Sequence, residues 1–261
     1  MKTVWCGVIA VIFAMVCGPV AADTTNTIIR VRGTVILQPL FAAAAVKYMR
    51  AHPNVTIDAK GTSSGEGMAS INAGRADIAG ADVHIGNSDL TETPMALAGV
   101  AFIVGPGTGV TNLTQDQVAK IFSGKITNWS QVGGNNLPIV IMERAVGGGT
   151  RFIFEQTIAK TTIPVQEYPN PNKMAAICNT TRGCLSYVAS YFVSVAHSTA
   201  ISYNGVAPTD GNIANGTYTF VGHETAYSAK PVKPEQADFL NFVLSDTSDY
   251  PAAGLIPPAR H

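Results

Sequence analysis

The sequence predicts an α/β protein of two lobes, with mixed, mostly parallel sheets flanked by helices and two hinge crossings. Short β-rich runs alternate with helical segments, a rhythm typical of parallel sheets that carry ligand loops at their carboxyl edge. Two flexible glycine-containing segments, 105–109 and 203–205, interrupt this rhythm and are predicted as the crossings. The predicted limits are 23–104 for the first part of lobe one, 105–203 for lobe two and 204–261 for the return to lobe one.

The individual elements follow from residue type and punctuation. Runs of Val, Ile and Thr favour strands, Ala-rich runs favour helices, and Pro53 and Gly74 end two helices. The elements predicted before the first crossing are 27–31, 40–50, 55–59, 68–74, 77–80 and 100–104. Those predicted after it are a helix at 115–122, a strand at 137–142, a helix from 150, a strand and helix within 186–195, and a helix at 234–244.

Composition narrows the class of protein. The chain has 261 residues, which is enough for two modest domains with ordinary cores. Hydrophobic residues make up 46% and charged residues 13%, so the chain is predicted to be globular. The formal net charge of the chain is zero, whereas binding to the phosphate backbone of DNA or RNA needs a basic protein surface. Nucleic acid is therefore not an expected partner.

The amino terminus predicts export. A short positive start at Met1–Thr3 precedes the apolar run 4–17, and small residues follow up to Ala22. This is the pattern of a secretory signal peptide, residues 1–22, cleaved after Ala22. The alternative is a membrane anchor, which needs about 20 apolar residues. Residues 14–16 fit a lipoprotein signal ending at Cys17 poorly, so the mature protein is expected to be soluble.

Two cysteines, Cys178 and Cys184, remain in the mature chain, with a turn-forming segment between them. In an oxidising compartment such a pair is predicted to form a disulfide, and two buried free thiols are the alternative. No further ligands are near enough in the sequence to suggest zinc.

Four loops that follow predicted strands could together hold an anion: 33–36, 61–67, 79–82 and 144–151. The second and fourth each open a helix, where unpaired backbone N–H groups and the helix dipole attract negative charge. Glycines allow close backbone approach, hydroxyls add donors, and Arg144 can add a two-pronged contact. Each loop alone also fits a plain turn, so the prediction rests on their joint presence.

These residues also match a family. The chain resembles the periplasmic phosphate-binding proteins of high-affinity phosphate ABC transporters, from about residue 28 to residue 258. The most specific segments are 121–129, 144–150 and 61–67, and their order and spacing match as well.

The resemblance implies a type II periplasmic binding protein fold, whose lobes close around the ligand. It also implies a monomer in the periplasm that delivers its ligand to the permease of an ABC importer. The predicted site residues are Thr34, Val35, Ser64, Asp82, Arg144, Gly148, Gly149 and Thr150.

Asp82 would select the ligand. A carboxylate accepts the proton of a protonated phosphate and repels sulfate, which has no proton to give, while Arg144 offsets the charges. Two positions depart from the family pattern: Val35 stands where Thr is common, beside Thr34, and Gly148 stands where Ser is common. Each change removes a hydroxyl donor, which leaves phosphate, arsenate, phosphite and an organic phosphate open as ligands.

The same residues also allow other functions. Gly61–Gly65 fits the G-x-S-x-G elbow of serine hydrolases, with Ser63 as nucleophile and His197 or His223 as base. No motif surrounds either histidine, so the prediction is a binding protein without catalytic residues, metal or cofactor. A sensing or scavenging role without transport remains the second alternative.

Overall fold

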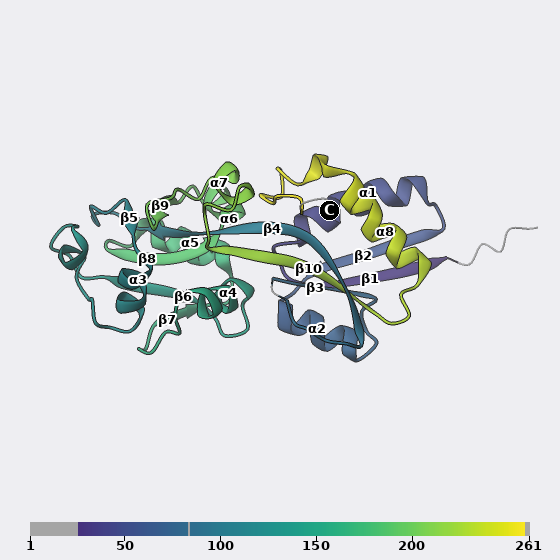
Figure 1. The fold of residues 1–261 in the computed structure, drawn as a ribbon, viewed down its shortest axis with the longest axis horizontal. Helices are drawn as coiled ribbons and strands as arrows, with labels where there is room; N and C mark the ends of the chain where they lie inside the picture. Colours follow the sequence, from purple (N-terminus) through teal and green to yellow (C-terminus); the bar gives the residue numbers. More distant parts are fainter. Residues whose placement is uncertain (1–25, 83, 259–261) are drawn as a thin grey trace, which may run out of the picture.

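The computed structural model describes residues 26–82 and 84–258, so the predicted signal peptide lies outside the described residues. Two α/β lobes lie side by side along the long axis of the molecule (Figure 1), which confirms the predicted two-lobed fold. No helix among the described residues is both long and apolar enough to span a bilayer.

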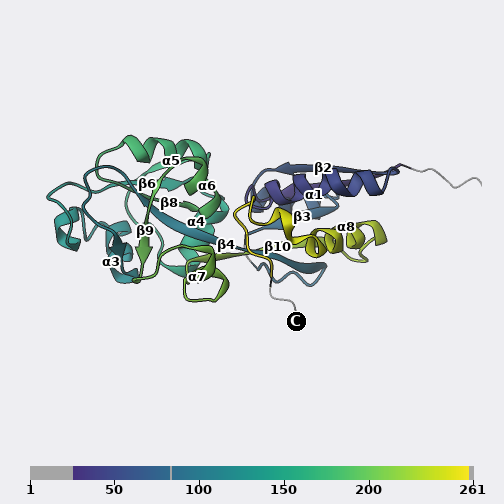
Figure 2. The same ribbon diagram turned by 90° about the horizontal axis from the view of Figure 1, so that it is seen from above.

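The first lobe begins with a parallel βαβαβ unit, and a carboxyl-terminal helix packs beside its first helix (Figure 2). Its elements are β1 (Thr27–Gly33), α1 (Gln38–Ala51), β2 (Val55–Gly61), α2 (Ser64–Asn72), β3 (Ile78–Ala81), α8 (Pro234–Ser245) and the 3₁₀ turn η2 (Thr247–Asp249). A proline stands in the first turn of both α1 and α8, where its missing N–H costs no hydrogen bond. The predicted helices at 40–50 and 234–244 are confirmed.

The second lobe contains shorter elements. They are β5 (Asn112–Leu113), α3 (Gln115–Phe122), the 3₁₀ turn η1 (Trp129–Val132), β6 (Val140–Arg144), α4 (Gly149–Thr157), β7 (Gln166–Tyr168), α5 (Pro171–Thr180), β8 (Cys184–Ala189), α6 (Ser190–Val195), β9 (Thr199–Tyr203) and α7 (Asp210–Ala214). Helix α3 matches its predicted limits, because Thr114 and Gln117 form a reciprocal capping box at its start.

Two long strands, β4 (Leu90–Val104) and β10 (Val221–Ala229), run between the lobes (Figure 1). Strand β4 pairs with β10 over residues 90–99 and with β8 over residues 100–104, so one strand serves both lobes. The residue limits of the lobes stay a prediction.

The strands follow the order β2-β1-β3-β10-β4-β8-β6-β7, and the sheet is mixed. Strands β1, β2 and β3 pair in parallel, as do β6, β7 and β8, whereas β4 and β10 pair with their neighbours antiparallel. The loops that leave β1, β3 and β6 all reach one cavity between the lobes, as shown below.

Buried apolar side chains pack into clusters in both lobes. In lobe two, Phe154 of α4 is fully buried and stacks on Tyr187, with ring centroids 4.6 Å apart. Each such buried ring stabilises the fold by about 1.5–3 kcal/mol. This packing fixes α4 in lobe two and so sets the position of its first residue, Gly149.

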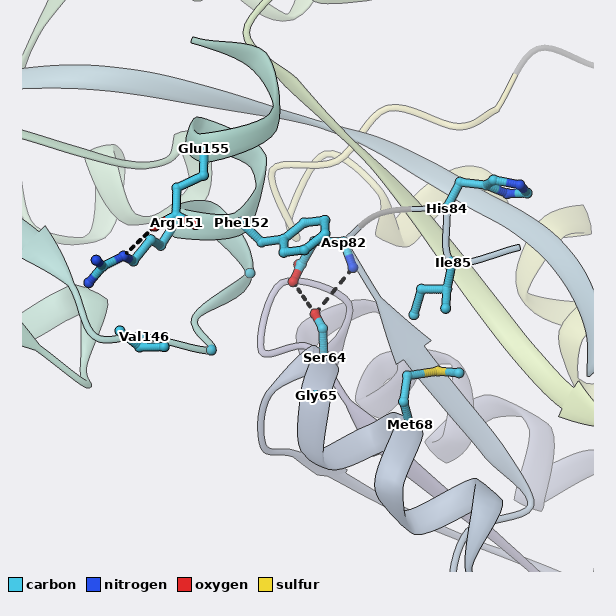
Figure 3. A pocket seen from close by; sticks show the side chains of 12 residues that line it. Ser64, Gly65, Met68, Asp82, His84, Ile85, Val146, Arg151, Phe152 and Glu155 are labelled. Carbon is cyan, nitrogen blue, oxygen red and sulfur yellow. Dashed lines mark hydrogen bonds and ion pairs between the residues drawn. The ribbon is translucent and has the colours of Figure 1, made fainter. Parts of the chain in front are cut away.

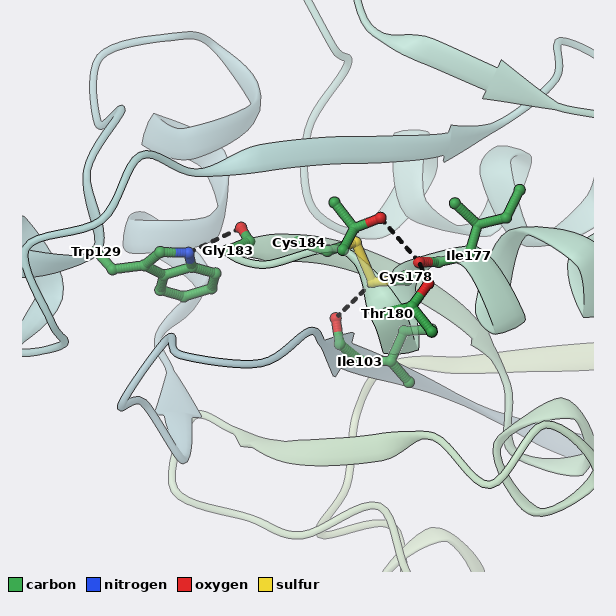
Figure 4. The surroundings of a disulfide bond; sticks show 8 residues. Ile103, Trp129, Ile177, Cys178, Thr180, Gly183 and Cys184 are labelled. Atoms are coloured by element: carbon green, nitrogen blue, oxygen red, sulfur yellow. Dashed lines mark hydrogen bonds between the residues drawn. A yellow bond between two sulfur atoms is a disulfide. The ribbon is translucent and has the colours of Figure 1, made fainter.

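A disulfide joins Cys178 in the last turns of α5 to Cys184 at the start of β8 (Figure 4). The Cα atoms are 5.4 Å apart and the cysteines are six positions apart in the sequence. The predicted disulfide is therefore confirmed, and the alternative of two free thiols is wrong. The bridge fixes the connection between α5 and the central strand of lobe two.

Candidate functional site

A small cavity of about 20 Å³ lies between the lobes and collects the predicted loops. Seven of the eight predicted residues line it: Thr34, Val35, Asp82, Arg144, Gly148, Gly149 and Thr150. The eighth, Ser64, reaches the same place through a hydrogen bond to Asp82. Residues far apart in the sequence thus meet because the strands before them end at this boundary.

Asp82 is the buried acid of the cavity and is only 2% exposed. The hydroxyl of Thr34 donates to Oδ1 and the hydroxyl of Ser64 donates to Oδ2. The Ser64 oxygen in turn accepts from the Asp82 backbone N–H at 3.3 Å. Burial raises the pKa of Asp82, and the two hydroxyl donors oppose that rise because they stabilise the anion.

The turn that carries Thr34 depends on a glycine. Gly33 has φ of 135°, and a Cβ atom on it would lie 2.1 Å from the carbonyl oxygen of Gly80. Only glycine therefore allows β1 and β3 to approach at this point. The approach brings Thr34 beside Asp82, the residue that follows β3.

Helix α4 of lobe two begins against the Asp82 carboxylate of lobe one. A Cβ atom on Gly149 would lie 1.4 Å from Asp82 Oδ2, so the two groups are in contact across the lobe boundary. The N-cap residue, Gly148, has no side chain that could cap the helix. The first turn thus offers backbone N–H groups and the positive end of the dipole to the cavity.

Arg144 supplies positive charge to the cavity from the end of β6 and is 7% exposed. Its Nη1 donates to the carbonyl oxygens of Tyr168, at 3.0 Å, and Pro169. Burial lowers the pKa of Arg144, and the charge of Asp82 opposes that shift. The hydrogen bonds hold the guanidinium group in place at the cavity wall.

Thr150 has a hydroxyl group without a partner. Its side chain is 5% exposed, and its Oγ1 forms no hydrogen bond among the described residues. Leaving a buried hydroxyl unpaired costs about 1–3 kcal/mol. A ligand oxygen in the cavity would remove this cost, so the geometry favours a ligand that accepts hydrogen bonds.

Two residues beside the cavity were not among the predicted site residues. Arg151 donates from Nη1 to the carbonyl oxygen of Arg144 at 3.0 Å and forms ion pairs with Glu143, Glu155 and Glu167. It thereby anchors the loop that carries Arg144, and its spacing of four from Glu155 was a readable signal. Glu224, buried beside Asp82, lies on β10, a strand that the sequence did not predict.

Ser63 does not have the surroundings of a nucleophile. It is the N-cap of α2, where its Oγ accepts from the backbone N–H of Glu66 at 3.2 Å. No hydrogen bond to a histidine is found for it within 26–82 and 84–258. In the same part of the chain, no group of three His, Cys, Asp or Glu could hold a metal ion.

A larger pocket of about 490 Å³ lies outside the small cavity (Figure 3). Met68 and Ile85 of lobe one face Val146 and Phe152 of lobe two across it. Gly149 and Asp82 border both the small cavity and the larger pocket, and the contact between these two residues separates the two spaces.

The family model for the PBP superfamily domain matches residues 19–247. The chain belongs to this superfamily.

Among curated relatives of this PBP superfamily member, the phosphate-binding protein PstS of Bacillus subtilis is 29% identical over 224 residues. The alignment covers 83% of this chain and 75% of that protein.

Solved structures agree with the family. An ABC-type phosphate transport receptor from Vibrio cholerae is 27% identical, with a TM-score of 0.75, covering 88% of this chain and 100% of that chain. A putative phosphate ABC transporter substrate-binding protein from Clostridium perfringens, with bound phosphate, has a TM-score of 0.82 at 24% identity. It covers 89% of this chain and 100% of that chain, and it supports the fold.

Proposed function

We propose that this protein captures inorganic phosphate in the small interlobe cavity and delivers it to an ABC importer. The observation that carries the proposal is that hydrogen-bond donors of lobe two face a carboxylate of lobe one across the cavity. Lobe two offers Arg144, the unpartnered hydroxyl of Thr150 and the start of α4, while lobe one offers the buried carboxylate of Asp82. The donors of lobe two would hydrogen-bond to the negatively charged oxygens of an oxyanion. The carboxylate of lobe one would accept a hydrogen bond from a ligand that still carries a proton.

The names of the relatives support the same ligand. The Bacillus subtilis relative is a phosphate-binding protein, and the Vibrio cholerae structure is a phosphate transport receptor. We extend both properties to this chain, together with binding rather than catalysis and export to the periplasm after cleavage near Ala22. Binding to one lobe, followed by contact with the other, would shift the population toward a closed form.

The small cavity also narrows the ligand class. At about 20 Å³ it leaves no room for an organic substituent, and the contact between Asp82 and Gly149 separates it from the larger pocket. Phosphate and arsenate therefore fit better than an organic phosphate. Val35 can offer its backbone N–H in place of the hydroxyl that the family commonly has. The Gly148 N–H instead donates to the carbonyl oxygen of Ala145 at 3.0 Å, so nothing at Gly148 replaces the second hydroxyl.

Isothermal titration of the mature protein with phosphate, arsenate, phosphite and sulfate tests the proposal. We expect one-to-one phosphate binding and at least tenfold weaker sulfate binding, the discrimination that a carboxylate facing the ligand provides. Arg144→Ala should abolish phosphate binding and leave the circular dichroism spectrum unchanged. Phosphate binding by Arg144→Ala at wild-type affinity would contradict the site.

An experiment in cells that lack this protein distinguishes transport from sensing. Loss of phosphate uptake after deletion supports the importer role. A changed response to phosphate with normal uptake supports sensing instead.

A further inference from the structure

Glu224 of β10 is a buried acid in an unusual setting. It is 1% exposed, and neither of its carboxyl oxygens has a hydrogen-bond donor among the groups of residues 26–82 and 84–258. An ionised carboxylate without donors is rare in a protein interior, because burial of an unpaired charge is costly.

The sheet register brings Glu224 to Asp82. Thr225 pairs with Ala81 in the antiparallel ladder between β10 and β3, so Glu224 lies next to the residue that follows Ala81. A Cβ atom on Gly222 would lie 2.9 Å from Glu224 Oε1 and 3.5 Å from the Asp82 carbonyl oxygen. The same point is 2.7 Å from Ile153 Cδ1, so lobe two closes this space with an apolar group.

The two acids differ in their donors. Thr34 and Ser64 each donate a hydroxyl to Asp82, whereas no described group donates to Glu224. The carboxyl groups of Asp82 and Glu224 lie within hydrogen-bonding reach of one another. Two buried carboxylates this close repel one another, so one of them retains a proton, and the acid without donors is the one that retains it. Burial, with the neighbouring charge of Asp82, raises the pKa of Glu224 well above its usual value.

We propose that Glu224 remains a neutral carboxylic acid in the folded protein and donates its proton to Asp82, so that the pair carries a single negative charge when phosphate binds. The inference rests on the proposed function and adds a specificity-determining residue to it.

The number of acceptor positions on Asp82 links the proton of Glu224 to phosphate affinity. A carboxylate has about four lone-pair positions. Thr34, Ser64 and Glu224 would occupy three of them, which leaves one for the P–OH group of a protonated phosphate. When alkaline pH removes the proton of Glu224, a second negative charge appears beside the anion, and affinity falls.

Three other charged or titratable groups lie near the pair in the part of the chain that the structure describes. Arg144 acts on Asp82 across the cavity, and His84 and His223 are exposed nearby, with His84 Nδ1 2.6 Å from Glu92 Oε2. Substitution at Glu224 alone therefore isolates its own proton.

Glu224→Gln tests the proposal, because the amide keeps a donor and cannot ionise. Phosphate affinity is measured by titration calorimetry at several values from about pH 6 to about pH 9. We expect the variant to bind within about threefold of wild type near pH 6 and at least about tenfold more tightly near pH 9. Asp238→Asn, which removes an exposed charge from α8, is the control and should follow wild type throughout. Identical pH profiles for wild type and Glu224→Gln would overturn the proposal.

Infrared difference spectroscopy supplies a readout that needs no ligand. Subtracting the spectrum of Glu224→Gln from that of wild type near neutral pH should leave the carbonyl band of a protonated carboxyl group. A carboxylate band in its place refutes the proton assignment. If wild type shows the protonated band but binds no phosphate, the assignment stands and the proposed function fails.

Discussion

Gly149→Ala tests the closed arrangement of the lobes with one methyl group. The new Cβ would lie 1.4 Å from Asp82 Oδ2, whereas ordinary van der Waals contact begins at 3.4 Å, so α4 and Asp82 must part by about 2 Å. Asp82 cannot turn away easily, because Thr34 and Ser64 hold both of its oxygens. Alanine favours a helix more than glycine by about 1 kcal/mol, so each lobe should still fold.

The cost to binding follows from that separation. Hydrogen bonds to an oxyanion near 2.9 Å would stretch to about 5 Å, beyond any useful range. Each hydrogen bond to a charged group is worth about 1.5–3 kcal/mol. Loss of two such bonds from lobe two costs about 3–6 kcal/mol, so phosphate affinity should fall by roughly 10²- to 10⁴-fold.

Titration calorimetry with phosphate measures this loss, and thermal unfolding without ligand checks the fold. Gly211→Ala is the matched control, because a Cβ atom there meets nothing within 4 Å. Wild-type affinity in Gly149→Ala would refute the contact between α4 and Asp82 as part of the binding form.

Three further substitutions test Asp82, Glu224 and the disulfide. Asp82→Asn should reduce the preference for phosphate over sulfate at least about tenfold, because an amide can donate to sulfate; competition titrations measure it. Since the pKa of Glu224 is raised above its usual 4.5, the stability that this group contributes is complete below about pH 4.5 and is lost as the pH rises toward the folded value. Urea unfolding should therefore show Glu224→Gln more stable than wild type by about 1–3 kcal/mol near pH 7 and equal to it near pH 4; a constant difference would contradict this. Cys178→Ser should lower the free energy of unfolding by about 2 kcal/mol, because the closed loop spans six positions, and leave phosphate affinity within about threefold.

Much of lobe one could be predicted because its elements are local. Pro53 and Gly74 separate its helices from the strands that follow, and each strand contains apolar β-branched residues. The loops at 33–36 and 61–67 were found because glycine and hydroxyl residues mark a helix start or a tight turn. These patterns depend on neighbours within about ten residues, which a sequence displays directly.

Strand β10 and the first half of β4 were missed for the opposite reason. Their residues mix polar and apolar types, since they pair antiparallel in the middle of the sheet and pass between the lobes. Glu224 would be taken for a surface residue on its type alone, because Glu is almost never fully buried. Pairing with distant strands buries it.

The sequence by itself determined the two-lobed α/β class, the pair of cysteines that forms the disulfide and most of the residues that line the small cavity. Turn glycines, helix starts and a short cysteine spacing indicate the fold class, the loops and the disulfide, because these are local features. The resemblance to phosphate-binding proteins indicates the individual site residues. Only the tertiary structure decided that α4 touches Asp82, that Arg151 anchors the Arg144 loop and that Glu224 lies beside Asp82. Those contacts join residues from different strands and lobes, and their distances depend on how the whole sheet is ordered.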